Sequence, residues 1–241
     1  MNDSKTEFII FGTKHQLKKC TTNCIQLENT NIARSDSVKY LGVHMDKEMN
    51  LTKHITEKCW IASFNLYKIR KIRKHFDLKS IRTIIQALVI SHLDYGNALL
   101  YDLPETTIKQ MQSIQNSAAK LILKLGKYDS STQALKTLHW LPIRKRIEFK
   151  ILTIVHKALY GTVPDYIKRM IRERTTGYNL RFKKELHVPK PKLKKLTDRS
   201  FSVCGPKLWN RLPQHLRVQE EFGTFKRLLK THLFRQHFNQ P

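Results

Sequence analysis

The chain of 241 residues has few acidic side chains, few cysteines and no long apolar run. Its 19 Asp and Glu stand against 45 Lys and Arg, which gives a formal net charge of +26. No apolar run approaches the roughly 20 residues of a membrane span. Four cysteines without a CxxC pair do not make a disulfide scaffold, and P-loop, GxSxG and HExxH motifs are missing. The sequence therefore predicts reduced cysteines, no membrane span and none of the enzyme classes that those motifs mark.

The composition predicts a folded protein that binds a polyanion. A hydrophobic content of 40% is enough to bury a core. A large positive charge destabilises a compact state unless a polyanion neutralises it, which favours nucleic acid as the partner over an anionic membrane surface. The polar start, Met1–Glu7, lacks the apolar stretch of about 7 to 15 residues of a secretory signal. We therefore expect an intracellular protein, in the nucleus or in a cytoplasmic ribonucleoprotein.

Charge and periodicity both change near residue 50. Residues 1–50 carry seven basic and six acidic side chains, so almost all the excess charge follows them. The β-branched and aromatic runs 7–12 and 37–45 predict a small antiparallel sheet. From Leu51 to Phe76 apolar residues recur every three or four positions, which predicts a long amphipathic helix. The expected fold class is α+β, mainly α.

Further helices are expected where capping residues flank periodic segments. They run over 78–93 after Asp77, from Pro104 to Gly126, and over 142–159 before Gly161, and Pro164 opens a short one. The chain is thus expected to have four parts: 1–50, a helical bundle 51–172, a basic extended linker 173–198 and a C-terminal extension 199–241.

Several phrases in the second half of the chain resemble one family. They are LHWLPI at 138–143, GTVP at 161–164, RSF at 199–201 and GPKLWNRLP at 205–213. In this order they resemble the region downstream of the polymerase core in jockey-like non-LTR retrotransposon reverse transcriptases. The resemblance implies that the chain holds the end of a palm, the primer grip, a helical thumb and a C-terminal extension.

The start of the chain resembles a polymerase motif without its metal site. Met1–Glu7 is similar to the family's Leu-Asn-x-x-Lys-Thr-Glu, which implies that Lys5 lies near the phosphates of an incoming nucleotide. The family holds two Mg²⁺ ions on palm carboxylates that include an Asp-Asp doublet, and this chain has no such doublet. We therefore expect no catalytic residues, no cofactor, with Mg²⁺ only in an intact parent, and no RNA-directed DNA polymerase activity.

The run 38–43 resembles the primer-grip hairpin. The resemblance implies that Leu41, Gly42 and Val43 help to hold the 3′ end of a primer strand. Gly42 would permit a close backbone approach. The alternative is an ordinary buried strand with a glycine bulge.

Two basic clusters are candidates for phosphate contacts. The first surrounds the apolar stripe of the long helix, as a thumb helix requires, and the second lies in the linker. The candidate residues are Lys68, Arg70, Lys71, Arg73 and Lys74 in the first cluster, and Lys183, Lys184, Lys190, Lys192, Lys194 and Lys195 in the second. A solvated helix face and a nuclear-import signal are the alternatives for the first cluster.

Other motifs favour packing over chemistry. The phrases at 97–99 and 112–119 resemble family segments and place small residues where helices approach closely. Trp140 and Trp209 are expected core anchors, with base stacking as the alternative. The spacing of Cys20 and Cys24 is not that of a standard zinc ligand pair.

Two functional hypotheses follow. The first is a truncated reverse transcriptase that retains only basic binding of RNA and DNA, with the missing upstream polymerase segment as a further partner and no membrane. The second is a domesticated, non-enzymatic RNA-binding or assembly protein.

Overall fold

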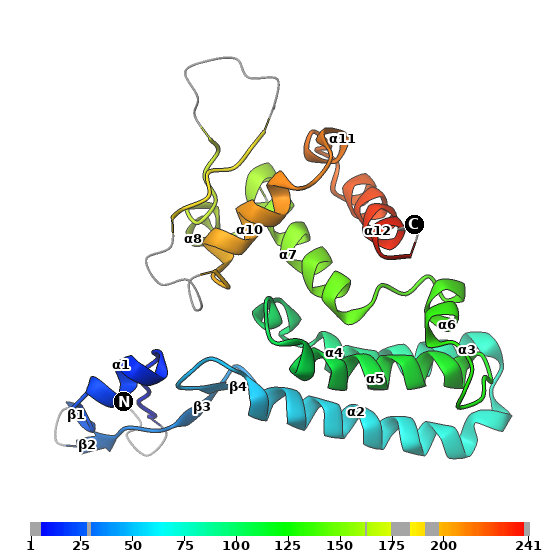
Figure 1. Cartoon of the computed structure of the whole chain (residues 1–241), viewed down its shortest axis with the longest axis horizontal. Helices are drawn as coiled ribbons and strands as arrows, with labels where there is room; N and C mark the ends of the chain where they lie inside the picture. The colour runs from blue at the N-terminus through cyan, green and yellow to red at the C-terminus, as the bar shows by residue number, and fades with distance from the viewer. Residues whose placement is uncertain (1–5, 28–29, 162, 175–183, 191–197, 239–241) are drawn as a thin grey trace. The chain divides into compact units, whose positions relative to one another are not determined.

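The computed structural model describes residues 6–27, 30–161, 163–174, 184–190 and 198–238. Helices dominate, and the strands form two antiparallel sheets of two strands each, which confirms the α+β, mainly α class (Figure 1). The chain divides into two compact units, Met1–Ile61 and Ala62–Pro241. The expected boundaries at residues 50, 172 and 198 stay predictions. In the described ranges, no helix combines the length and the apolar character needed to cross a membrane.

The first unit contains a short helix and two hairpins. The helix begins with a capping box, because the Thr13 side chain accepts from the Gln16 N–H while the Gln16 side chain accepts from the Thr13 N–H. β1 pairs antiparallel with β2, and β3 with β4. The elements are α1 (Lys14–Lys19), β1 (Cys24–Leu27), β2 (Thr30–Ala33), β3 (Ser37–Tyr40) and β4 (Val43–Asp46).

The predicted strand over 7–12 is not formed. Phe8 makes an isolated parallel bridge with Arg34, and the Gly12 N–H donates to the Lys47 carbonyl at 3.0 Å. The segment is therefore tied to two different partners and has no single ladder. The run 37–45, by contrast, is the β3–β4 hairpin, as expected. Local periodicity does not reveal which backbone partners a short apolar run will meet.

Helix α2 (Thr52–Ile72) follows the predicted stripe. In the second unit its buried face consists of Ala62, Leu66 and Ile69. The α-helix ends at Ile72, before the expected Phe76, and a 3₁₀ turn follows it. The first half of the second unit continues with η2 (Arg73–His75), α3 (Leu78–Ile85), the π-helical turn η3 (Gln86–Ile90), α4 (Ser91–Asp94), η4 (Asn97–Leu100), α5 (Glu105–Ile122) and α6 (Ser131–Thr137).

The helix ends show which capping predictions hold. Asp77 caps α3, since its carboxylate accepts from the Ser80 N–H at 2.9 Å. Pro104 lies at the N-cap of α5. α5 ends before Gly126, because Lys124 takes the left-handed conformation at φ +56° and the Leu125 N–H returns to the Lys120 carbonyl. This is a Schellman-type end built on lysine in the place of glycine.

The helix predicted over 78–93 contains one π turn. α3, η3 and α4 follow one another without a break, and the Ser91 N–H donates to the Gln86 carbonyl five residues earlier. The amide of Asn65 on α2 donates to the Leu88 carbonyl at 2.8 Å, so this turn is bound to α2. A π turn adds one residue to a helix, often near a functional site.

The second half of the second unit is built on α7. α10 and α12 both pack against it (Figure 1). Gly205 permits the close approach of α10, because a Cβ there would lie 2.9 Å from Val155 Cγ2. Gly161 ends α7 at φ +105°, as the sequence predicts. The elements are α7 (Ile143–Tyr160), α8 (Asp165–Lys168), α10 (Phe201–Asn210), α11 (Gln214–Arg217) and α12 (Phe222–Phe238).

His156 and Trp209 lie at the centre of this core. Trp209 is fully buried and His156 is 1% exposed, so the packing prediction for Trp209 is confirmed. The His156 ring stacks on Phe225 with centroids 4.2 Å apart, and its Nε2 lies 2.9 Å from the Gln219 carbonyl. A titratable ring is thus enclosed by aromatic neighbours.

We expect the protein to lose stability as the pH falls below about 6.5, in part through His156. Burial lowers the pKa of His156 below its ordinary value of 6.5. The unfolded chain therefore takes up a proton at a higher pH than the folded chain, which favours unfolding in acid. Urea unfolding at pH values between about 8 and 5 should show a smaller decline for His156→Phe than for the parent. His232 and His237, whose pKa values burial also lowers, should keep part of the dependence.

The described part of the expected linker is anchored. Leu186 is buried, and its backbone exchanges two hydrogen bonds with the side chain of Asn210, each 2.8 Å long. The Trp209 Nε1–H donates to the Lys184 carbonyl at 3.1 Å. The described residues 184–190 are therefore bound to α10 and lie in the second unit, and the linker over 173–198 stays a prediction.

Candidate nucleic-acid interface

Most of the basic cluster around the end of α2 faces solvent. The four exposed side chains are Lys68, Arg70, Lys71 and Lys74. They follow one another within two helical turns, so several can reach neighbouring phosphates of one strand. These four side chains are accessible to an anionic partner, and their contact with phosphates stays a prediction.

Arg73 does not belong to this exposed set, although the sequence analysis placed it there. Its side chain is buried, and its guanidinium donates to the carbonyls of Leu121, Ile122 and Phe76 at 3.0, 2.9 and 2.8 Å. Two of these carbonyls are at the C-terminal end of α5, where unpaired carbonyls attract a cation. Arg73 therefore joins the end of α2 to the end of α5.

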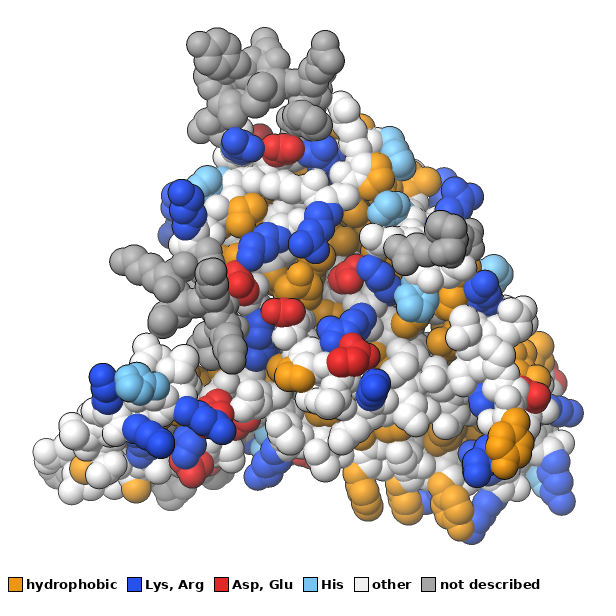
Figure 2. Space-filling model, viewed as in Figure 1, with side chains coloured by type: hydrophobic (Ala, Val, Ile, Leu, Met, Phe, Trp, Pro, Cys, Tyr) orange, Lys and Arg blue, Asp and Glu red, His pale blue; other side chains and the backbone are white. Residues whose placement is uncertain are grey.

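Aromatic side chains alternate with the lysines on α2. Phe64 and Tyr67 are 43% and 56% exposed. Lys68 Nζ lies 4.3 Å from the Phe64 ring centroid, and Lys71 Nζ lies 4.6 Å from that of Tyr67. Figure 2 shows hydrophobic side chains projecting along the edge where α2 runs. Exposed rings beside cations can stack on bases. The sequence does not single these rings out, because an apolar residue at helical spacing usually belongs to the core.

A cationic hollow of about 580 Å³ lies beside this cluster. Arg70 and Arg73 line it from one side, and lysines that the sequence analysis did not single out line the other: Lys120, Lys124 and Lys127. Among the described residues that line it, none is acidic. Lys124 has a left-handed backbone conformation just after the end of α5. Lys120 Nζ donates to the Lys127 carbonyl at 2.8 Å. The hollow extends the positive surface of α2.

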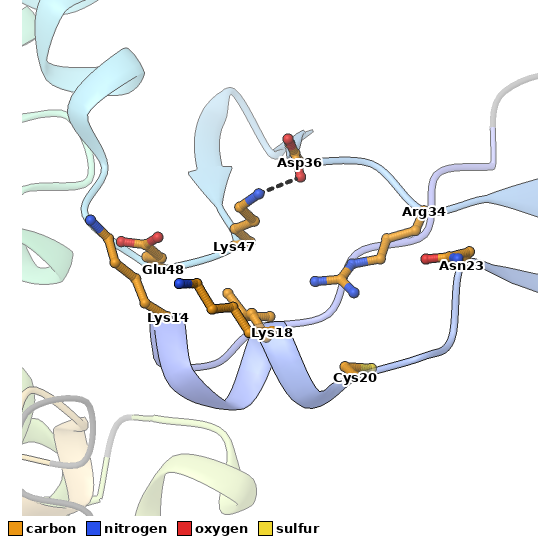
Figure 3. A pocket seen from close by; sticks show the side chains of 9 residues that line it. Lys14, Lys18, Cys20, Asn23, Arg34, Asp36, Lys47 and Glu48 are labelled. Carbon is orange, nitrogen blue, oxygen red and sulfur yellow. Dashed lines mark hydrogen bonds and ion pairs between the residues drawn. The ribbon is translucent and has the colours of Figure 1, made fainter.

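The first unit has its own basic hollow, of about 560 Å³. Figure 3 shows Lys14 and Lys18 reaching from α1 and Arg34 from the end of β2. Lys47 is paired with Asp36 at 2.8 Å, and this pair lowers the pKa of Asp36. Glu48 also lines the hollow, so the three cations Lys14, Lys18 and Arg34 exceed the remaining negative charge by two.

Two of the predicted primer-grip residues, Leu41 and Gly42, form the turn of the β3–β4 hairpin, and Val43 begins β4. Leu41 and Gly42 have φ of +46° and +75°, the left-handed pair of a two-residue turn. Gly42 therefore serves the turn and not a strand bulge. Leu41 is 76% exposed, whereas Val43 is buried. Lys5, predicted to lie near the phosphates of an incoming nucleotide, is outside the described residues.

The linker lysines are only partly described. Lys190 is exposed. Lys184 is occupied: its Nζ donates to Tyr160 Oη at 2.8 Å and to Glu220 at 2.9 Å, and the bond to Tyr160 is the main cause that raises its pKa. The other candidates lie outside the described residues: Lys183, Lys192, Lys194 and Lys195.

Comparison with known proteins gives one relevant similarity. The chain is 28% identical, over 127 residues, to a probable RNA-directed DNA polymerase from transposon X-element of Drosophila melanogaster. This supports a reverse-transcriptase-like relationship. The match covers 51% of the chain and 13% of that polymerase. No protein-family model matches the chain. No solved structure matches it either.

A magnesium pair does not fit the described residues. In the part of the chain that the structure describes, no three His, Cys, Asp or Glu side chains come together as metal ligands do. The full sequence has no Asp-Asp doublet.

Proposed function

We propose that the chain is the C-terminal part of a jockey-like non-LTR retrotransposon reverse transcriptase, cut off from the catalytic aspartates. In this proposal it comprises the end of the palm, the primer grip, the thumb and the C-terminal extension. Its partners are RNA and DNA, together with the upstream polymerase segment. It acts inside the cell without a cofactor of its own, and Mg²⁺ belongs to the intact polymerase. The similarity to a transposon polymerase supports this proposal.

The retained function is binding of the phosphate backbone. The observation that carries it is the continuity of the α2 cluster with the cationic hollow, because Arg70 belongs to both. Lys120, Lys124 and Lys127 extend the row of cations, and no acidic side chain is among the described residues lining the hollow. Contacts of this type position a nucleic acid without reading its sequence, and they weaken as salt rises.

Neutralising the α2 cluster should weaken binding equally on unrelated sequences. The variant changes Lys68, Arg70, Lys71 and Lys74 to Gln and leaves the buried Arg73 in place. Each phosphate contact contributes roughly 0.9 to the slope of log K against log salt on duplex DNA, so the slope should fall by up to about 3.6. Fluorescence anisotropy with two unrelated duplexes over a salt series measures both quantities.

The matched control removes the same charge elsewhere in the second unit. It changes four exposed arginines and lysines of α12 and the α8 end to Gln: Arg169, Lys226, Arg227 and Arg235. This control should change the slope much less, because only the general positive field decreases. Equal effects from the two variants would show that net charge, and not the α2 surface, governs binding.

A further inference from the structure

A second hollow in the second unit, of about 380 Å³, lies between α3, η4, α7 and α12. Four cations reach it from three helices: Arg82 from α3, Arg146 and Lys150 from α7, and Lys230 from α12. None of them lines the hollow beside α2. The volume is within the range of pockets that bind small molecules.

The charge in this hollow is not balanced. Asp94 is the sole carboxylate among the described residues lining it, and Arg146 already binds both of its oxygens, with Nε 2.8 Å from Oδ1. Asn97 Nδ2 also donates to Asp94, at 3.3 Å. Arg82 has a backbone partner, the Leu138 carbonyl at 3.4 Å, which leaves its charge uncompensated. Asp94 thus compensates one of the four cations.

Lys230 lies close to the other cations of the hollow. Burial lowers the pKa of this lysine, and the charges of Arg82 and Arg146 lower it further. Arg82, Lys150 and Lys230 are exposed, so their mutual repulsion is partly screened by solvent, and an anion between them would reduce it further. The cluster is therefore prepared for a negatively charged ligand.

Part of the remaining wall of the hollow is apolar, and Gln86, Asn97 and His139 complete it. Trp140 and Phe149 line it beside the cations. A ligand that carries both an oxyanion and a flat ring can use the cations and this wall together, since charge-assisted bonds hold phosphates and aromatic side chains hold rings.

We propose that this hollow binds a phosphate monoester attached to a nucleoside. The ligand is either a free nucleotide or the 5′-phosphorylated end of a nucleic-acid strand, which share this chemistry. Arg82 and Lys230 bind the phosphate, Arg146 is held ready by Asp94, and the ring lies toward Trp140. This site is separate from the phosphate surface of α2, so it holds whether or not that surface binds nucleic acid.

The test measures binding of AMP, inorganic phosphate and two single strands that differ only in a 5′ phosphate, at physiological salt. Isothermal titration calorimetry should show either that AMP binds or that the phosphorylated strand binds about ten-fold more tightly than the other. A ten-fold difference in affinity is about the contribution of one charge-assisted hydrogen bond. AMP binding identifies a free nucleotide as ligand, and strand preference alone identifies a strand end. Changing Arg82 and Lys230 to Gln should abolish either signal. The four-residue α2 variant should keep it.

Two results would overturn the proposal. One is the lack of both AMP binding and 5′-phosphate preference in the folded parent. The other is an Arg82 and Lys230 double variant whose AMP binding and 5′-phosphate preference fall no further than those of the α2 variant. If circular dichroism shows that Arg82→Gln disturbs folding, the single changes Lys230→Gln and Lys150→Gln decide, because both side chains are exposed and the bond to the Leu138 carbonyl comes from Arg82.

Discussion

Replacing Arg73 with methionine should lower the free energy of unfolding of the second unit by about 3 kcal/mol or more. Methionine keeps much of the apolar stem but removes three charge-assisted hydrogen bonds, and each is worth about 1.5 to 3 kcal/mol. The carbonyls of Leu121 and Ile122 would lose their partner where α5 ends. Urea unfolding followed by helical circular dichroism measures the change.

Arg70→Met is the matched control, three positions earlier in the same basic run. Arg70 is exposed, so stability should change by less than about 0.5 kcal/mol, while affinity for nucleic acid falls. The two arginines are thus expected to give opposite results. A stable Arg73→Met protein with weak binding would mean that Arg73 leaves its carbonyls and contacts phosphate, as the sequence analysis first placed it.

Replacing Trp209 with alanine should destabilise the second unit by about 3 to 5 kcal/mol. The ring is fully buried, with its centroid 5.7 Å from that of Phe225, and its N–H holds the Lys184 carbonyl. The variant leaves a cavity on α7 and also releases the segment 184–190. Urea unfolding measures the loss, and proteolysis near residue 184 should quicken.

Two variants separate the contributions of Trp209. Trp209→Phe keeps a ring but removes the N–H donor, so it should cost less than the alanine variant and still release the Lys184 carbonyl. Trp60→Ala removes a side chain that is 67% exposed and should have little effect on stability. Trp60 belongs to the first unit, so similar losses from Trp60→Ala and Trp209→Ala would show that burial of the Trp209 ring is not the cause of its effect.

Local chemistry predicts much of this fold. Asp77 and Gly161 mark helix ends because each satisfies backbone groups within its own turn, which sequence spacing reveals. Pairing of strands depends on distant partners. The apolar run 7–12 accordingly failed as a strand, because Phe8 and Gly12 bond to residues far along the chain.

The candidate interface was predictable only in outline. Density of Lys and Arg on α2 was visible in the sequence, but the burial of Arg73 depends on where α5 ends, 48 residues later. The sequence does not reveal the lysines of the cationic hollow either, because their position also depends on contacts between distant parts of the chain. Lys120 and Lys127 are close to Arg70 only because the two helices meet at their ends.

The π turn at η3 also restricts how related chains can differ in length. Each residue of an α-helix rotates the next by about 100°. A relative that lacks the additional residue between Gln86 and Ile90 would present another face of α4 to α7, and a side chain other than Asp94 would meet Arg146. A deletion in this turn would therefore change the ion pair between α4 and α7. A compensating substitution would be expected at the position of Arg146.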